Sequence, residues 1–193
     1  MRMTRLRDFL KAIASKLFER YELQRIYRLD LSGVDEAIPE TEYVLRRITQ
    51  SDVERCPVAR IRERAGYGGE HAHGFAVFEG ESIVCMSWFW DGERFRDHYL
   101  CRPAEREAVM VDLVTVDSHK GRGLAPLLTR FAAAEFKRAG FRTLHTWVWH
   151  SNSASIRSFE KAQWTCTAYL VYLKLRGLPA IHFRRKRRVP PAV

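Results

Sequence analysis

The chain has 193 residues, of which 46% are hydrophobic and 29% charged, and its formal net charge is +10. This length suits one domain with a terminal extension, and the composition is that of an ordinary soluble globular protein. No apolar run approaches the roughly 18 residues that a membrane span requires. The charge excess favours an anionic partner, and the candidates are nucleic acid, an anionic membrane and a phosphorylated small molecule.

The four cysteines are scattered along the chain, at Cys56, Cys85, Cys101 and Cys166. No pair has the spacing of a zinc site, so we expect no metal, and reduced thiols are typical of the cytosol. The basic start MRMTRLRDFLKAIASK carries too many charges for the apolar region of a signal peptide. We therefore expect a cytoplasmic protein, with a membrane-peripheral location as the alternative.

The N-terminal part of the chain is expected to be a helical extension. Residues 5–29 carry apolar side chains at steps of three and four, which predicts a basic amphipathic helix. Its stripe is expected to pack against the core or a partner, with a membrane surface as the alternative. Residues 31–41 read as a linker, so the predicted division is an extension over 1–40, a catalytic domain over 41–183 and a basic tail over 184–193.

The rest of the chain alternates strand-like and helix-like segments. Ser51 or Asp52 is the expected cap of a helix that Pro57 divides, and Glu79-Gly80-Glu81 is the expected turn of a hairpin. A mixed sheet with helices on both faces and a right-handed parallel crossover at its centre follows. Strands are predicted over 41–48, 73–95 (the hairpin), 108–116, 141–150, 164–177 and 179–187, and helices over 124–140 and 152–163, with 95–107 irregular.

A glycine-rich turn separates the 108–116 strand from the helix that follows. Gly121 and Gly123 would let an anion approach the backbone, and Lys120 and Arg122 add positive charge. The first N–H groups of a helix lack intrahelical partners and point outward with the helix dipole, which is an arrangement that binds phosphate. The patterns of a Walker loop and of a dinucleotide fingerprint are absent. The turn therefore predicts a phosphate site of another kind.

Two motifs together resemble the GCN5-related N-acetyltransferases, the GNAT superfamily. The family's acyl-CoA motif is Gln/Arg-x-x-Gly-x-Gly/Ala after a strand, and this chain has Lys where Gln or Arg is usual. A second family signature follows the next strand, with Gln163-Trp164 here in place of Gly-Phe. The resemblance covers roughly residues 42–176. The residues that carry it are Lys120, Gly121, Arg122, Gly123, Leu124 and Ala125, and then Asn152, Ser155, Phe159 and Lys161.

The resemblance implies an α/β (mixed α+β) fold with a central, mostly antiparallel sheet, helices on both faces and a β-α-β CoA-binding unit. It also implies direct transfer of an acetyl group from acetyl-CoA, as co-substrate, to a primary amine in a ternary complex. The backbone from Gly121 to Pro126 would hold the CoA pyrophosphate. The Val114, Thr115 and Val116 backbone would pair with the pantetheine arm, and a bulge in that strand would aim an N–H at the thioester oxygen. Asn152 would bind the pantetheine or a catalytic water, or cap a helix.

An amine nucleophile must lose a proton, so a base is expected near the acyl group. Asp112 is the candidate, because it lies on the motif strand where many relatives carry a carboxylate. Its alternative roles are substrate binding and a structural ion pair. His145 and His150 flank the next strand and are weaker candidates. Aromatic side chains on the neighbouring strands are expected to divide between core and cleft wall; they are Trp88, Phe89, Trp90, Trp147 and Trp149.

One departure from the family concerns the proton donor. Phe159 stands seven residues after Asn152, where relatives often carry a tyrosine that protonates the departing thiolate. Water, CoA itself, Tyr169 or Tyr172 would have to replace it. The alternatives are a non-catalytic or regulatory acyl-CoA-binding module and a membrane-apposed transferase for a lipid-linked or sugar amine. Amino-sugar, amino-acid and protein amines all stay open as acceptors, as does a homodimer.

Overall fold

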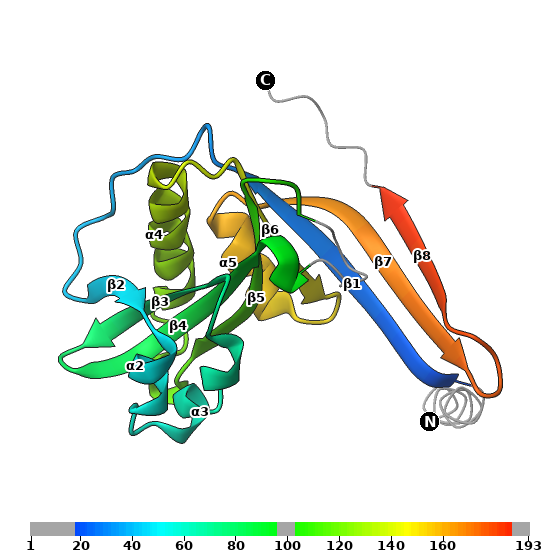
Figure 1. Cartoon of the computed structure of the whole chain (residues 1–193), viewed down its shortest axis with the longest axis horizontal. Helices are drawn as coiled ribbons and strands as arrows, with labels where there is room; N and C mark the ends of the chain where they lie inside the picture. Colours follow the sequence, from blue (N-terminus) through cyan, green and yellow to red (C-terminus); the bar gives the residue numbers. More distant parts are fainter. Residues whose placement is uncertain (1–17, 96–102, 187–193) are drawn as a thin grey trace, which may run out of the picture.

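One mixed sheet organises the protein, with strands in the order β2-β3-β4-β5-β6-β1-β7-β8 (Figure 1). The computed structural model describes residues 18–95 and 103–186, so the predictions for 1–17 and 187–193 lie outside the described residues. The strands are β1 Phe18–Asp30, β2 Val44–Ile48, β3 Ala72–Glu79, β4 Ser82–Asp91, β5 Glu107–Thr115, β6 Thr143–Trp149, β7 Thr165–Leu175 and β8 Ile181–Lys186.

Four α-helices and three short 3₁₀ helices connect the strands of this part of the chain. The pairing is antiparallel except between β5 and β6, which run parallel on either side of the crossover through α4. The predicted mostly antiparallel sheet with a central β-α-β unit is therefore confirmed. The helices are α2 Gln50–Glu54, α3 Ala59–Arg62, α4 Leu124–Arg138 and α5 Ser153–Lys161, with η1 Ala65–Tyr67, η2 Gly92–Phe95 and η3 Asp117–His119.

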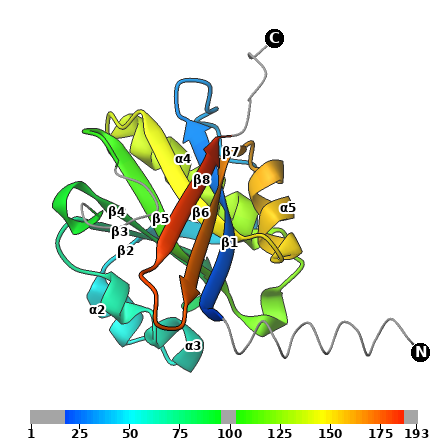
Figure 2. The ribbon, with the colours of Figure 1, turned by 90° about the vertical axis from the view of Figure 1, so that its right-hand side faces the viewer.

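The prediction of a helix over residues 5–29 is wrong for its described part, because residues 18–30 form β1. This strand lies between β6 and β7 and is hydrogen-bonded on both edges (Figure 2). Its inner end is buried on both faces, with Ile26 and Tyr27 2% and 0% exposed, so its apolar residues do not follow a simple alternation. The predicted domain start at residue 41 thus falls after a strand that is integral to the sheet.

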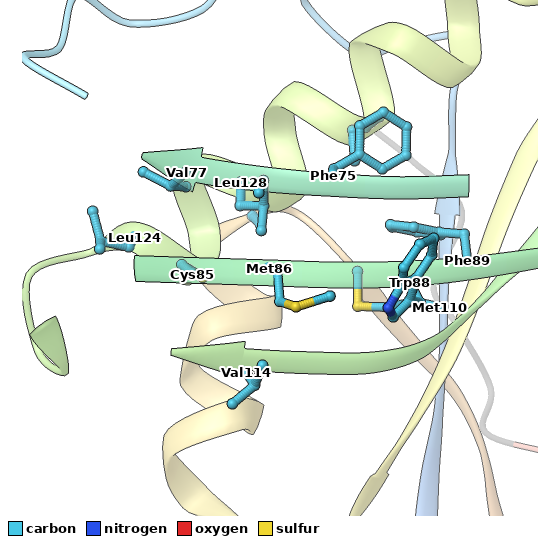
Figure 3. Packing of buried hydrophobic residues seen from close by; sticks show 14 of the residues in the cluster. Phe75, Val77, Cys85, Met86, Trp88, Phe89, Met110, Val114, Leu124 and Leu128 are labelled. Atoms are coloured by element: carbon cyan, nitrogen blue, oxygen red, sulfur yellow. The ribbon is translucent and has the colours of Figure 1, made fainter. Parts of the chain in front are cut away.

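Aromatic packing shows how the helices cover the two faces. On one face, Phe136 of α4 lies 5.5 Å from Phe75 and 4.9 Å from Phe89, measured between ring centroids. Figure 3 shows Phe75 and Phe89 among the buried residues of this core. Helix α5 covers the same face further along, where Phe159 stacks on Tyr27 at 5.8 Å. Because neighbouring residues of a strand point to opposite faces, the buried Trp88 lies on the other face.

Helices α2, α3 and η1 pack on the face of Trp88. There the Trp90 indole N–H donates to the Tyr67 carbonyl at 2.8 Å. The residue that caps α2 is Thr49 rather than the predicted Ser51 or Asp52, because Thr49 and Asp52 exchange hydrogen bonds in a capping box. Pro57 separates α2 from α3 as expected. No helix among the residues described here is long and apolar enough to cross a membrane.

The centre of the sheet opens between β5 and β6. The two strands pair only from Glu107 to Val109 and then diverge. At the fork, the Thr146 hydroxyl donates to the Met110 carbonyl at 3.1 Å. Beyond this point the edge of β5 that faces β6 has no strand partner, which leaves its backbone groups available to a ligand.

Candidate functional site

Two cavities meet at the opening between β5 and β6. The larger cavity extends from the glycine turn along β5 to α5 and has a volume of about 580 Å³. This volume is typical of a small-molecule site, for which roughly 300–1,000 Å³ is usual. The smaller, of about 150 Å³, lies deeper in the fork against Trp147 and Trp149. Both are lined by Asp112, Leu113, Asn152 and Ser155.

The glycine turn forms one end of the larger cavity. Gly121 and Gly123 have φ angles of +82° and +80°, and a Cβ added at either would meet no other atom within 4 Å. Gly123 is the N-cap of α4 and no side chain caps the helix there. The first N–H groups of α4, at Leu124 and Ala125, are therefore free of side-chain partners and border an open space. This geometry suits a phosphate group.

The side chains beside the turn behave differently from one another. Lys120 lines the larger cavity and forms an ion pair with Asp117 at 2.5 Å. Arg122 points away toward Glu79, at 3.7 Å, and does not line either cavity. Pro126 lies in the first turn of α4, where a residue without an N–H is tolerated. It also borders the larger cavity.

Further cations around the larger cavity come from segments far apart in the sequence. Arg157 and Lys161 lie one helical turn apart on α5. Arg60 lies on α3, and Arg64 is the N-cap residue of η1. The sequence analysis named Lys161 only as part of the family signature, and it did not name the three arginines. The spacing of Arg157 and Lys161 on the helix that Asn152 begins was the available signal, whereas Arg60 and Arg64 reach the site only through the tertiary fold.

The motif strand carries the predicted bulge. Trp88 pairs with Asp112 and Phe89 pairs with Met110, so Val111 is the extra residue. Further along, the Val116 N–H donates to the Val84 carbonyl of β4 at 3.0 Å. Because successive N–H groups of a strand point to opposite sides, the N–H groups of Thr115 and Leu113 face the open edge instead.

This alternation refines the predicted pantetheine contacts. Val114 and Thr115 line the larger cavity and Val116 does not. Of the three predicted residues, only Thr115 both lines the larger cavity and directs its backbone N–H toward the open edge. Leu113 has the same two properties, and the sequence analysis did not name it.

The second motif surrounds the start of α5. The Asn152 side-chain oxygen accepts a hydrogen bond from the Ser155 N–H at 3.1 Å, so Asn152 caps the helix and also lines both cavities. Phe159 borders the smaller cavity and is 3% exposed, held between Tyr27 and Trp164. Among the described residues, no tyrosine lines either cavity.

Asp112 lies where the cavities join. Its carboxylate faces Arg64, with 3.9 Å between Oδ2 and Nε, and this oxygen accepts no hydrogen bond. Burial raises the pKa of Asp112 above its ordinary value, and the nearby Arg64 charge only partly opposes the increase. A carboxyl group in this environment is a better proton acceptor than an exposed one.

Comparisons with known proteins agree with this geometry. The model of the acetyltransferase (GNAT) family matches residues 38–163, which is more than half of the chain. The chain belongs to the GNAT acetyltransferase family. A search of curated proteins finds no match.

Solved GNAT structures share the fold at low sequence identity. An acetyltransferase of the family from Novosphingobium aromaticivorans is 16% identical, with a TM-score of 0.56 over 81% of this chain and 65% of that one. A tandem GNAT protein from the clavulanic acid biosynthesis pathway is 15% identical, with a TM-score of 0.59 over 89% and 59%. A GCN5-related N-acetyltransferase from Sphaerobacter thermophilus is 14% identical, with a TM-score of 0.55 over 92% and 56%. The chain thus spans 56–65% of the length of these structures.

The remaining candidates of the sequence analysis lie away from the GNAT cavities. His145 bonds Glu107 at 3.1 Å where β5 and β6 still pair, and burial lowers the pKa of His145 although Glu107 opposes the decrease. His150 contacts Arg25 at 3.4 Å. Neither histidine, nor Tyr169 on β7, lines the cavities.

The aromatic residues divide between core and cleft. Trp88 and Phe89 are 1% and 0% exposed and belong to the core, whereas Trp147 and Trp149 form a wall of the smaller cavity.

Tyr172 lies on β7 and does not line either cavity. His119, which the sequence analysis did not consider, borders the larger cavity and bonds Glu79 at 3.1 Å. No metal-binding group of side chains occurs within residues 18–95 and 103–186.

Proposed function

We propose that this GNAT protein is an N-acetyltransferase that moves an acetyl group from acetyl-CoA to a primary amine. The observation that carries the proposal is the position of Asp112, which lies where the large cavity beside the glycine turn meets the small aromatic-walled cavity. The large cavity fits a long phosphorylated cofactor and the small one fits the end of an acceptor. A group that accepts a proton stands between them.

The residues around the large cavity suit CoA. The backbone from Gly121 to Pro126 and the N-terminus of α4 would hold its pyrophosphate, and the open edge of β5 at Leu113 and Thr115 would pair with its pantetheine arm. Arg157 and Lys161 supply further positive charge for phosphate groups. Acetyl-CoA, when bound, supplies the acyl group as a thioester.

Asp112 would take the proton that an ammonium group must lose before its nitrogen can attack. The bond between nitrogen and the acyl carbon forms as the bond between that carbon and sulfur breaks, and the nitrogen then loses its second proton to water to give the neutral amide. The sulfur then takes a proton from water or from another group, because the ring of Phe159 has none to donate. Ser155 is the residue of the second motif that carries a hydroxyl and lines both cavities.

The aromatic wall bears on the acceptor. Trp147 and Trp149 can stack on a sugar ring or cover an aliphatic chain next to the reacting amine. Amino-sugar, amino-acid and protein amines are all compatible with such a wall.

Phe159 favours a second candidate function, a regulatory module that binds acyl-CoA without turnover. Two assays separate the candidates. Isothermal titration with acetyl-CoA and CoA tests the site, and thiol release from acetyl-CoA across a panel of amines tests the chemistry. Binding with turnover that Asp112→Asn abolishes supports the transferase, binding without turnover supports the module, and no binding at high micromolar acetyl-CoA refutes both.

A further inference from the structure

Strands β1, β7 and β8 extend beyond the helices as a three-stranded arm (Figure 1). Their register places Tyr21 beside Leu173 and Leu173 beside Ile181 in one row, and Leu23, Val171 and Phe183 in the next. Directly paired residues share a face of a sheet, so these six side chains form one surface. We call it the arm face, and it consists of Tyr21, Leu23, Val171, Leu173, Ile181 and Phe183.

The arm face is open although it is apolar. Tyr21, Ile181 and Phe183 are 54%, 59% and 61% exposed, and Leu178 in the turn between β7 and β8 is 56% exposed. Nearer the domain the same face is covered by α5, which packs on Tyr27. None of the described helices lies over the two outer rows (Figures 1 and 2). Most large exposed apolar side chains of the described residues thus gather on this arm.

Positive charge surrounds the arm face. The row next to it holds Arg25 and Arg185 on either side of Tyr169, and Arg176 lies beside Leu178 at the turn. Residues 18–25 and 169–186 together carry seven Arg or Lys and two Glu. Of the two acidic residues, Glu19 pairs with Lys174 at 2.6 Å and Glu22 is buried. The arm is therefore strongly basic.

We propose that the arm face is an attachment surface for an anionic lipid bilayer. Aliphatic and aromatic side chains would enter the boundary between headgroups and acyl chains, while the arginines contact lipid phosphates. A second copy of the chain fits less well, because its basic residues would face those of the first. Nucleic acid also fits less well, since leucine, valine and isoleucine side chains cannot stack on bases.

The sequence before the arm has matching chemistry. Residues 1–17 lie outside the described part and carry five Arg or Lys against one Asp, with apolar residues at steps of three and four. They join β1 at Phe18, at the same end of the arm as Tyr21 and the β7–β8 turn. A bilayer that binds the arm face would therefore also be within reach of this basic segment.

The test is co-sedimentation of the full chain with vesicles. Phosphatidylcholine vesicles with and without phosphatidylglycerol are compared at low salt and at about 0.15 M ionic strength, where the Debye length is about 8 Å. The proposal predicts binding to the anionic vesicles that weakens with salt, and little binding to the neutral ones. No binding to anionic vesicles at low salt would overturn it.

Two arm variants, each with a control away from the arm, locate the surface. Ile181→Ser with Phe183→Ser removes apolar contact, and Val44→Ser is its control, because Val44 is 56% exposed on β2 at the opposite edge of the sheet. The second arm variant combines Arg176→Gln and Arg185→Gln. Its control combines Arg55→Gln and Arg142→Gln, which lie away from the arm, so both double variants lower the net charge by two.

Each arm variant should lower the vesicle partition coefficient about tenfold or more, and the controls by much less. Circular dichroism melting shows that the variants fold. Equal losses in arm and control variants would overturn the proposal. Two other results would do so: a concentration-dependent dimer in ultracentrifugation that only the Ile181 and Phe183 variant dissociates, or binding of a DNA duplex in preference to vesicles.

Discussion

Replacing Gly123 with alanine separates the backbone conformation of the glycine turn from its proposed role in binding CoA. Gly123 has a φ angle of +80°, which is strained for a residue with a Cβ, and no atom lies within 4 Å of the added carbon. The left-handed conformation costs roughly 1–2 kcal/mol, of which roughly 0.4–1 kcal/mol is offset by the lower entropy of the unfolded chain. We therefore expect a net loss of about 1 kcal/mol and a decrease in Tm of about 2–4 °C.

Gly140→Ala is the matched control. Gly140 follows the other end of α4, with a φ angle of +82° and the same open space, so its alanine variant should lose the same stability. Only Gly123→Ala adds a carbon where the CoA pyrophosphate is proposed to lie. Its Kd for CoA should rise at least tenfold, which corresponds to about 1.4 kcal/mol.

The measurements are thermal melting and isothermal titration with CoA. Equal Kd values in the two variants, at equal loss of Tm, would show that the turn does not contact the ligand. A large loss of Tm in Gly123→Ala alone would mean instead that the turn is needed for the fold, which the open space around it argues against.

Two further predictions concern the chemistry of the site, and a third concerns a buried cysteine of the core. Asp112→Asn should abolish turnover without lowering Tm at neutral pH. Burial raises the pKa of Asp112, so the charged carboxylate is disfavoured in the folded protein. In the parent protein, kcat/KM should fall in acid as the pH drops through that raised pKa. A parent profile that stays flat down to the ordinary aspartate pKa would contradict this. Phe159→Tyr should raise kcat at unchanged CoA affinity if the missing proton donor limits turnover, and an unchanged kcat would show that protonation of the thiolate is not limiting. Cys85 should resist alkylation by iodoacetamide in the folded protein at pH 8, because burial raises the pKa of its thiol to about 12; rapid labelling seen by mass spectrometry would contradict the buried position.

Local pattern was sufficient for the central β-α-β unit and the glycine turn. The apolar run of β5, the long helical stripe of α4 and the two glycines each follow from the conformational preferences of neighbouring residues. Asn152 was named from the family signature, and its alternative role as a helix cap is confirmed by its hydrogen bond from the Ser155 N–H.

The N-terminal strand was predicted wrongly for a physical reason. Residues 18–30 have apolar positions that fit a helical period, and their strand conformation comes from pairing with β6 and β7, which are more than a hundred residues away. Non-local hydrogen bonds of this kind override a weak local preference. The cation cluster of Arg60, Arg64 and Arg157 was missed for the same reason, because its members come from separate segments.

The sequence by itself determined the helix-capping glycine turn, the order of the elements around it and the membership of a fold family, because these depend on residues close together in the chain. Only the tertiary structure decided that β1 completes the sheet, that Asp112 is buried between two cavities and that an apolar, basic arm is left uncovered. Each of these features depends on which distant segments pack together. Burial and strand pairing between such segments cannot be predicted from the residues that are neighbours in the sequence.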